Sequence, residues 1–175
     1  KNNNYVANSE ASKKVLNSLN KISKTESSIL LSGLSGSGRE FLARKIHFES
    51  NRNNKRFKVI DFSDLDKVKT EIKLFGSEEK GMIKSVGILE DVNGGTLFVK
   101  NIDKMNSKIQ GKILRVLEEK KYYRIGGLSP NNINFRIISS SNMLLNDLKK
   151  CGSFSSDLLN KINFFEIMVP SIKER

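Results

Sequence analysis

Apolar residues recur at two spacings along the chain, and the alternation of these spacings predicts an order of helices and strands. Residues 9–24 and 106–120 carry apolar side chains at helical spacing, which gives each segment one apolar face. Strands that alternate with such helices indicate a mostly parallel sheet with helices on both faces, and ligands bind these sheets at the carboxyl ends of the strands. Short apolar runs typical of buried strands lie at residues 28–32, 57–62, 96–99, 134–139 and 164–169.

The remaining segments carry weaker patterns. Ser9 is the expected N-cap of the first helix. Residues 64–75, 143–150 and 155–162 are also predicted to be helical, and residues 76–87 are predicted to form an exposed loop. A further amphipathic helix is expected after residue 38, with the apolar members Phe41, Leu42, Ile46 and Phe48.

A glycine-rich segment separates a predicted strand from the helix that follows it. Residues 33–40 read GLSGSGRE, and Gly33 and Gly38 have the spacing of a phosphate-binding loop, G-x-x-x-x-G-K-[ST]. Small residues there let backbone N–H groups surround phosphate oxygens. Arg39 takes the position of the Lys, and Glu40 takes that of the Ser or Thr that helps to hold Mg²⁺. From the residues alone, a phosphate-binding loop and a plain turn both fit this segment.

Composition excludes several classes of protein. The single cysteine, Cys151, rules out an internal disulfide and a cysteine-based zinc site, and no metal site is predicted. No run of about 18 apolar residues is present, so no membrane span is expected. The polar start at residues 1–5 does not have the pattern of a signal peptide. We therefore expect a soluble, cytoplasmic α/β protein.

The charge is strongly positive and unevenly distributed. Lys and Arg number 31 against 19 Asp and Glu, which gives a formal net charge of +12. Residues 1–60 hold 12 of the basic residues and 4 of the acidic ones. A solvated basic face and an anion-binding face both remain open as interpretations. His47, a lone histidine on a predicted helix, is interpreted as structural. The excess of positive charge in residues 1–60 comes notably from Arg44, Lys45, Arg52, Lys55, Arg56 and Lys58.

Several blocks follow the motif order of a known family along nearly the whole chain. Residues 33–40 are similar to GESGTGKE, residues 94–99 to GGTLFL, residues 110–119 to the LLRVLQE helix, residues 136–142 to RIIAATN and residues 169–175 to LPPLRER. These motifs belong to the central AAA+ ATPase domain of NtrC-type bacterial enhancer-binding proteins, the activators of sigma-54 RNA polymerase. The chain therefore resembles this domain.

The resemblance implies a three-layer α/β/α P-loop fold with a mostly parallel five-stranded sheet over residues 1–175. The family's small helical lid, receiver domain and helix-turn-helix module have no counterpart here, so we expect a fragment of a longer regulator. ATP or ADP is the expected ligand. Asn142 matches a sensor-type Asn of the family, and it also fits as the cap of a helix that begins near residue 143. The expected nucleotide-binding residues are Gly33, Leu34, Ser35, Gly36, Ser37, Gly38, Arg39, Glu40 and Asn142.

The departures from the family pattern fall on its chemistry. The family's Walker B strand ends in Asp-Glu, and Lys100 and Asn101 stand at those positions. Lys100 cannot coordinate a metal, so we expect poor Mg²⁺ binding, and Asn101 cannot take a proton from water. Asp61 aligns with the family's strand-two Asn, which pairs with the Walker B Glu. The two arginine-finger positions are Ser155 and Lys161. We assign no catalytic residue.

The loop that contacts the sigma factor also departs from the family. The family carries GAFTGA there, and only Gly81 matches, which argues against a working sigma-54 contact. The corresponding residues are Gly81, Met82, Ile83, Lys84, Ser85 and Val86.

Three functions remain open. The leading interpretation is a AAA+-like domain of a transcription regulator that neither hydrolyses ATP nor activates sigma-54, and serves as an oligomerisation or nucleotide-sensing platform. The second is an unorthodox ATPase that remodels RNA polymerase holoenzyme, with Asp61 or Asp103 holding Mg²⁺. The third is nucleotide binding without hydrolysis. We expect self-association of the full-length protein and DNA contact through an absent C-terminal module, and leave contact with RNA polymerase or a sigma factor open.

Overall fold

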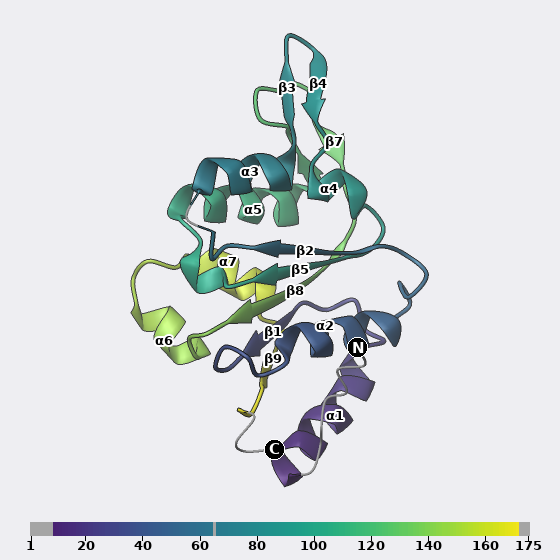
Figure 1. The fold of residues 1–175 in the computed structure, drawn as a ribbon, viewed down its shortest axis with the longest axis vertical. Helices are drawn as coiled ribbons and strands as arrows, with labels where there is room; N and C mark the ends of the chain where they lie inside the picture. The colour runs from purple at the N-terminus through teal and green to yellow at the C-terminus, as the bar shows by residue number, and fades with distance from the viewer. Residues whose placement is uncertain (1–8, 65, 172–175) are drawn as a thin grey trace.

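Five parallel strands form the centre of the molecule (Figure 1). The computed structural model describes residues 9–64 and 66–171. All four strand pairings are parallel, so the carboxyl ends of the strands meet at one edge of the sheet. In the order in which they lie side by side, the strands are β2 (Phe57–Asp61), β5 (Thr96–Lys100), β8 (Arg136–Ser141), β1 (Ile29–Ser32) and β9 (Phe165–Met168).

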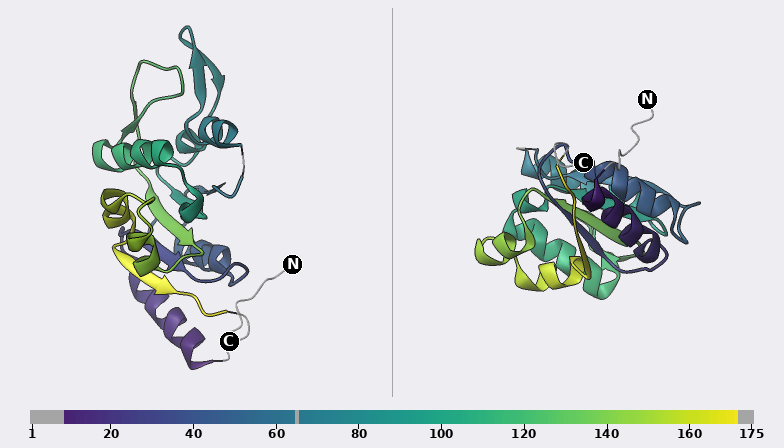
Figure 2. Two further views of the ribbon diagram at one scale, coloured as in Figure 1. Left: turned by 90° about the vertical axis from the view of Figure 1, so that its left-hand side faces the viewer. Right: turned by 90° about the horizontal axis from the view of Figure 1, so that it is seen from below.

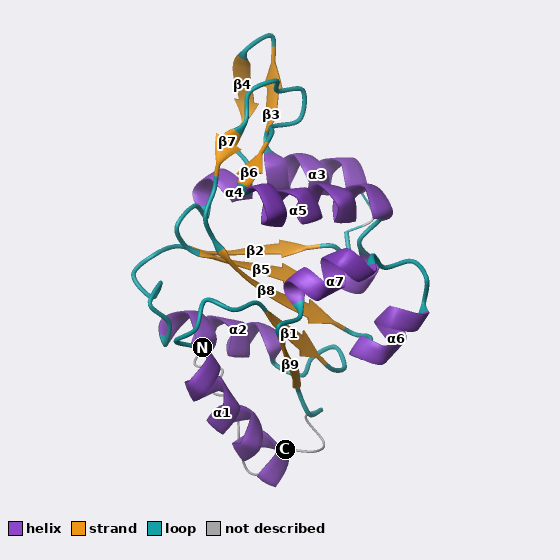
Figure 3. Ribbon diagram, turned by 180° about the vertical axis from the view of Figure 1, so that it is seen from behind, coloured by secondary structure: helices purple, strands orange, loops and turns teal. Residues whose placement is uncertain are grey.

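Helices cover both faces of this sheet, as Figures 1 and 3 show from opposite sides. One face packs against α1 (Glu10–Ile22) and α2 (Arg39–Phe48). The other packs against α3 (Lys67–Phe75), α5 (Ser107–Glu119) and α7 (Ser156–Ile162). The predicted three-layer α/β/α arrangement is confirmed.

Alternate residues of one strand enter different cores, which explains the uninterrupted apolar runs in the sequence. Leu30 of β1 packs on the side of α3, α5 and α7, whereas Ile29 and Leu31 pack on the side of α1 and α2. Successive side chains of a strand point to opposite faces, so a strand covered on both faces needs apolar residues at every position.

Three of the longer helices, α1, α3 and α5, begin where the sequence offers a capping side chain. The Ser9 hydroxyl accepts a hydrogen bond from the N–H of Ser12 at 3.2 Å, so the predicted N-cap of α1 is confirmed. Asp66 caps α3 and Asn106 caps α5 in the same way. The two short helices predicted at residues 143–150 and 155–162 are α6 (Leu145–Lys150) and α7.

The prediction of a loop at residues 76–87 is wrong, because most of this segment forms a β-hairpin. Its strands are β3 (Ser77–Glu79) and β4 (Met82–Ser85), and Gly81 in the turn has a φ of 78°. The polar run SEEK concealed the first strand, since apolar alternation was the only strand signal available. Other short elements outside the prediction are α4 (Ile88–Asp91), β6 (Lys121–Tyr122), β7 (Asn131–Asn132) and the 3₁₀ helix η1 (Ile102–Lys104).

Phe48 lies outside the core, contrary to the prediction. It was expected on the apolar face of α2, but its side chain is 73% exposed at the last position of that helix.

Among the residues that the structure describes, no helix is long and apolar enough to cross a membrane. The expectation for residues 1–5 and part of the 169–175 motif lie outside the described residues.

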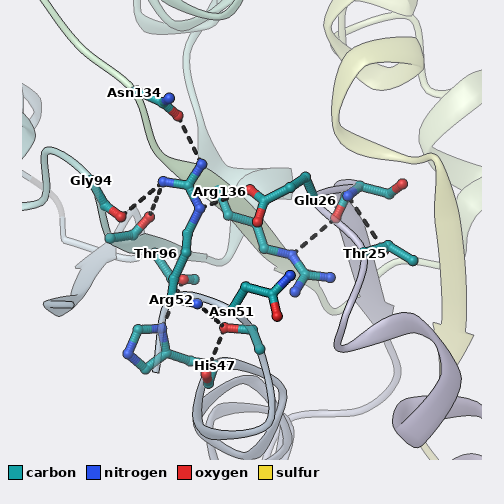
Figure 4. Close-up of polar contacts among 12 residues, drawn as sticks. Thr25, Glu26, His47, Asn51, Arg52, Gly94, Thr96, Asn134 and Arg136 are labelled. Atoms are coloured by element: carbon teal, nitrogen blue, oxygen red, sulfur yellow. Dashed lines mark hydrogen bonds and ion pairs between the residues drawn. The ribbon is translucent and has the colours of Figure 1, made fainter. Parts of the chain in front are cut away.

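Two arginines tie the amino ends of the strands to the helices (Figure 4). Arg136 is 1% exposed and donates to the backbone oxygens of Ile22, Ser23 and Ser27, at 2.9, 2.6 and 3.1 Å. These oxygens belong to the end of α1 and the turn after it, where a cation interacts favourably with the helix dipole. Burial lowers the pKa of Arg136 to about 10. Arg52 donates to Asn134 at 2.8 Å.

The basic surface of the first third of the chain is largely paired with carboxylates. The Arg52–Glu26 pair has a distance of 2.7 Å and the Arg56–Asp91 pair one of 3.3 Å. This pairing favours the solvated face over an anion-binding one. The basic residues of this surface that form ion pairs are Arg44, Lys45, Arg52, Arg56 and Lys58.

His47 is structural, as predicted. Its ring is buried, with Nδ1 2.8 Å from the Thr96 hydroxyl and Nε2 3.0 Å from the backbone oxygen of Lys55 (Figure 4). Burial lowers the pKa of His47 below 6.5, the Lys55 oxygen works against this shift, and the charges of Arg136 and Arg44 add to it.

Replacing Arg136 with Met should destabilise the fold strongly. The variant leaves three backbone oxygens without their donor, so the free energy of unfolding should fall by about 3 kcal/mol. Urea denaturation measures this loss. The matched control is Arg56→Met, because Arg56 is exposed and its ion pair is worth less than about 1 kcal/mol. Equal losses in both variants would contradict the role given to Arg136.

The lowered pKa of His47 predicts a loss of stability in mild acid. The unfolded chain takes up a proton near pH 6.5, whereas the folded protein keeps the ring neutral to a lower pH. The contribution of His47 to the free energy of unfolding is therefore fully present above pH 6.5, and it is lost as the pH falls toward the pKa of the folded state. Urea midpoints of the wild type should decrease as the pH is lowered below 6.5, and those of His47→Gln should decrease less. Parallel curves would argue against this assignment.

Candidate functional site

The loop between β1 and α2 lies at the carboxyl edge of the sheet and has a tightly turned backbone. Gly36 and Gly38 have φ angles of 78° and 77°, which glycine adopts without strain. The Ser37 N–H donates to the Leu34 oxygen at 3.2 Å. A side chain at Gly33 would lie 2.6 Å from the Val169 oxygen. This loop leads directly into the first turn of α2, whose backbone N–H groups attract anions.

A cavity of about 560 Å³ lies beside this loop and collects most of the predicted site residues. Three strand ends contribute side chains to it, through Asp61 of β2, Lys100 of β5 with the following Asn101, and Asn142 after β8. Three of its lining residues, Ser63, Phe98 and Ser140, were not predicted, although ligands bind such sheets at the carboxyl ends of the strands, where these residues lie. The full lining is Ser35, Gly36, Gly38, Arg39, Glu40, Asp61, Ser63, Phe98, Lys100, Asn101, Ser140 and Asn142.

A second cavity, of about 530 Å³, lies next to the same loop and is largely apolar. The predicted residues Gly33 and Leu34 line it, and Asn142 lines both cavities. Leu144 and Met168 were not predicted, because no local pattern marks them as cavity residues. The remaining lining residues are Ala11, Val169, Pro170 and Ser171.

Arg39 holds the loop rather than pointing freely into the cavity. Its guanidinium donates to the Gly33 oxygen at 3.0 Å, to the Ser141 oxygen, and to Asn142 Oδ1 at 2.6 Å. Burial lowers the pKa of Arg39, and the nearby charge of Asp103 works against this shift. With these bonds made, Arg39 joins the end of β8 to the loop after β1.

Lys100 forms an ion pair with Glu40 across the cavity. Lys100 Nζ lies 3.1 Å from Glu40 Oε2, and Arg44 Nη2 lies 3.0 Å from Glu40 Oε1. Burial alone would raise the pKa of Glu40, but the hydrogen bonds and charges of Lys100 and Arg44 hold it below its ordinary value. Lys100, at the expected Walker B position, is therefore bonded to Glu40, the last residue of the glycine-rich segment.

A chain of hydrogen bonds runs along the strand ends from Arg39 to Asp61. Arg39 donates to Asn142, Asn142 Nδ2 donates to Asn101 Oδ1 at 3.2 Å, and Asn101 Nδ2 donates to Asp61 Oδ1 at 2.7 Å. Burial alone would raise the pKa of Asp61, but the Ser63 N–H, Asn101 and the charge of Lys100 lower it. Each amide donates in one direction only, so the chain joins a cation to an anion.

This chain of hydrogen bonds excludes one of the two interpretations of Asn142. Its side chain bonds to Arg39 and Asn101, and the N-cap position of α6 belongs to Leu144. The helix-cap alternative is therefore wrong. Asp103, considered as a substitute acid, accepts the backbone N–H of Asn142 at 3.2 Å and does not line the cavity.

The residues of this cavity do not fit a magnesium site. Mg²⁺ requires oxygen ligands in near-octahedral geometry. Glu40 and Asp61 are the two carboxylates of the lining, and both already accept hydrogen bonds from neighbouring donors. Within residues 9–64 and 66–171, no three His, Cys, Asp or Glu side chains form a group that could hold a metal ion.

Two predicted positions lie away from the cavity, on and beside α7. The Ser155 hydroxyl caps this helix by accepting the N–H of Leu158 at 3.2 Å, and the Ser155 N–H donates to Gln110 at 2.7 Å. Lys161 is exposed near the end of the same helix. Ser155 therefore has a structural role as the N-cap of α7.

The predicted sigma-contact segment, residues 81–86, covers the turn and the second strand of the β3–β4 hairpin, which extends away from the sheet (Figure 2). Met82, Ile83 and Val86 are 59%, 52% and 56% exposed. The hairpin base closes at Gly76 and Gly87, where a side chain on Gly87 would lie 2.4 Å from the Gly76 nitrogen.

Comparisons with known proteins agree with this architecture. The sequence model of the family described as Sigma-54 interaction domain matches residues 5–168. The chain is 33% identical over 174 residues to the transcriptional regulatory protein FlbD of Caulobacter vibrioides, an alignment that covers 97% of this chain and 38% of FlbD. This chain thus spans well under half the length of that relative.

Solved structures show the same fold. A crystal structure of NtrX from Brucella abortus, 33% identical, has a TM-score of 0.91 and covers 98% of this chain and 39% of that one. Further crystal structures of that NtrX are complexes with ADP and with ATP. A P-loop NTPase domain from E. coli, 17% identical with a TM-score of 0.61, covers 95% of this chain and 99% of that one, and shares the fold.

The hydrogen bond from Asn101 to Asp61 can be tested by titration. Asn101 has a left-handed φ of 57°, so glycine can replace it without backbone strain. Asn101→Gly removes one donor, and the pKa of Asp61 should therefore rise toward its ordinary value of 3.8. Carboxyl-carbon NMR measures this shift. Asn132→Gly, at an exposed position of β7, is the control, and an unchanged Asp61 in the Asn101 variant would refute the bond.

Proposed function

This chain belongs to the sigma-54 interaction domain family, and we propose that it binds ATP or ADP without hydrolysing it, as a sensing and oligomerisation platform. It is the AAA+-like domain of a transcription regulator related to sigma-54 activators. The observation that carries the proposal is the pair of cavities on the two sides of the 33–38 loop, combined with an ion pair at the positions where hydrolysis requires acids.

The two cavities together suit a nucleotide. One is polar and lies against a glycine-rich loop and a helix N-terminus, as phosphate groups require. The other is lined by Leu34, Leu144, Met168 and Val169, which suit a base. Asn142 lines both, so one ligand can reach from one to the other. The ADP and ATP complexes of the related NtrX support this assignment.

The positions that would drive hydrolysis lack the required groups. Lys100 and Asn101 stand where a metal-binding and a water-activating acid are needed. Ser155 carries no charge, and Lys161 lacks the planar fork of an arginine finger. Because one arginine finger alone supplies about 10³–10⁵ in rate, loss of these groups together supports nucleotide binding without turnover.

The altered hairpin supports a function without sigma-54 activation. Its turn retains Gly81 from the family motif, but Met82 and Ile83 stand where the family has small and aromatic residues. The full-length protein then self-associates through this domain and contacts DNA through another module. In this arrangement, the nucleotide state of the domain regulates assembly rather than remodelling RNA polymerase.

One observation favours the alternative of an active ATPase that remodels RNA polymerase holoenzyme. The carboxylate of Asp61 remains at the strand edge, bonded to Asn101. The acid and the amide have in effect exchanged strands relative to the family pattern. In this alternative Asp61 replaces the missing acid, and restoring the family residues by Lys100→Asp with Asn101→Glu should change turnover little.

Glycine variants separate binding from hydrolysis. Gly36 lines the phosphate cavity with a φ of 78° and open space around it, and Gly81 has the same φ and open space in the hairpin turn. Asp tolerates this conformation, so Gly36→Asp places a negative charge in the cavity. Calorimetry should show that Gly36→Asp weakens ADP and ATP binding about tenfold or more, and that Gly81→Asp does not.

A coupled phosphate-release assay on the full-length protein completes the test. The wild type should bind nucleotide and release no phosphate above background. Turnover of about 1 s⁻¹ would contradict the proposal and favour the Asp61 alternative. Equal binding by Gly36→Asp and the wild type would exclude the phosphate cavity as the site.

A further inference from the structure

We propose that this site binds nucleotide phosphates without a divalent metal, because the Lys100 ammonium supplies the positive charge that a metal would bring. The inference rests on the proposed nucleotide-binding function and names the ionic form of its ligand, the metal-free nucleotide. Two features carry it: the position of Lys100 beside the phosphate loop, and the pairing of every carboxylate in the cavity lining.

Lys100 lies where phosphate groups would meet it. It ends β5 and lines the same cavity as Gly36 and Gly38, and its ammonium reaches Glu40 in the first turn of α2 at 3.1 Å. The backbone N–H groups of that turn and the helix dipole attract anions to the same place. An ammonium is a compact charge with three donors, which suits phosphate oxygens.

The carboxylates of the cavity are already engaged. Glu40 accepts from Lys100 and Arg44, and Asp61 accepts from Asn101 and the Ser63 N–H. A divalent ion would have to displace these donors and would meet the positive charge of Lys100 directly. The disagreement between this donor set and a magnesium site is therefore electrostatic as well as geometric.

The second partner of Glu40 lets Lys100 turn toward a ligand. Arg44 lies 3.0 Å from Glu40 Oε1, while Lys100 bonds to Oε2. When Lys100 leaves for a phosphate oxygen, Glu40 therefore keeps a cation beside it. Arg39 cannot take this part, because its guanidinium is bonded to the Gly33 and Ser141 oxygens that hold the loop. Lys100 is thus the cation available to the ligand.

Titration of the full-length protein with ATP and with ADP, in Mg²⁺ and in EDTA, tests the inference. The wild type should bind with affinities in the two buffers that agree within about threefold. Lys100→Asp replaces the ammonium by a carboxylate, so its binding in EDTA should weaken about tenfold or more and should recover when Mg²⁺ is added. Calorimetry measures both.

A matched variant separates this effect from net charge. Lys104→Asp makes the same charge change at an exposed position of η1 that does not line the cavity, and its binding should remain independent of Mg²⁺. If Lys100→Asp fails to fold, Lys100→Met serves instead, and its binding should weaken in both buffers without recovery by Mg²⁺.

The outcomes separate this inference from the function on which it rests. Wild-type binding that requires Mg²⁺ overturns the metal-free site and leaves nucleotide binding intact. Unchanged binding by Lys100→Asp in EDTA also overturns it. Absence of binding by the wild type in both buffers overturns the proposed function itself.

Discussion

The parallel pairing of β2, β5, β8 and β1 brings four strand ends to one edge, and the polar cavity of the site depends on it. Asp61 is in register with Lys100, and Ser32 is in register with Ser141. The residues that follow these positions therefore lie beside one another, although Asp61 and Asn142 are far apart in the sequence. The chain of hydrogen bonds from Arg39 to Asp61 follows directly from this register.

At this edge, two residues that differ from the motifs quoted for the family are bonded to side chains from other elements. Lys100 pairs with Glu40, and Asn101 donates to Asp61. A Glu at the position of Asn101 could not donate to Asp61, and two carboxylates at this distance would repel. These residues therefore form a self-consistent arrangement of one ion pair and one hydrogen bond beside the 33–38 loop.

The arrangement of strands and helices could be predicted from the local sequence pattern. The contacts of individual side chains could not. Buried strands and amphipathic helices have strong apolar periodicity, so the three-layer arrangement followed from the sequence. The β3–β4 hairpin was missed because its polar residues carry no such pattern, and Phe48 was misplaced because a helix end can leave the core. The glycine loop was found because its spacing is a local constraint, whereas the apolar cavity around Leu144 required strands to be placed side by side.

Residue types alone show that Lys100, Asn101 and Ser155 carry no acid and no guanidinium at the positions where the resemblance predicts them. What these residues do instead depends on contacts between segments that are far apart in the chain. The partners of Lys100 and Asn101 are Glu40 and Asp61, which come from other elements. Such contacts depend on strand register and helix placement, which no local pattern in the chain specifies.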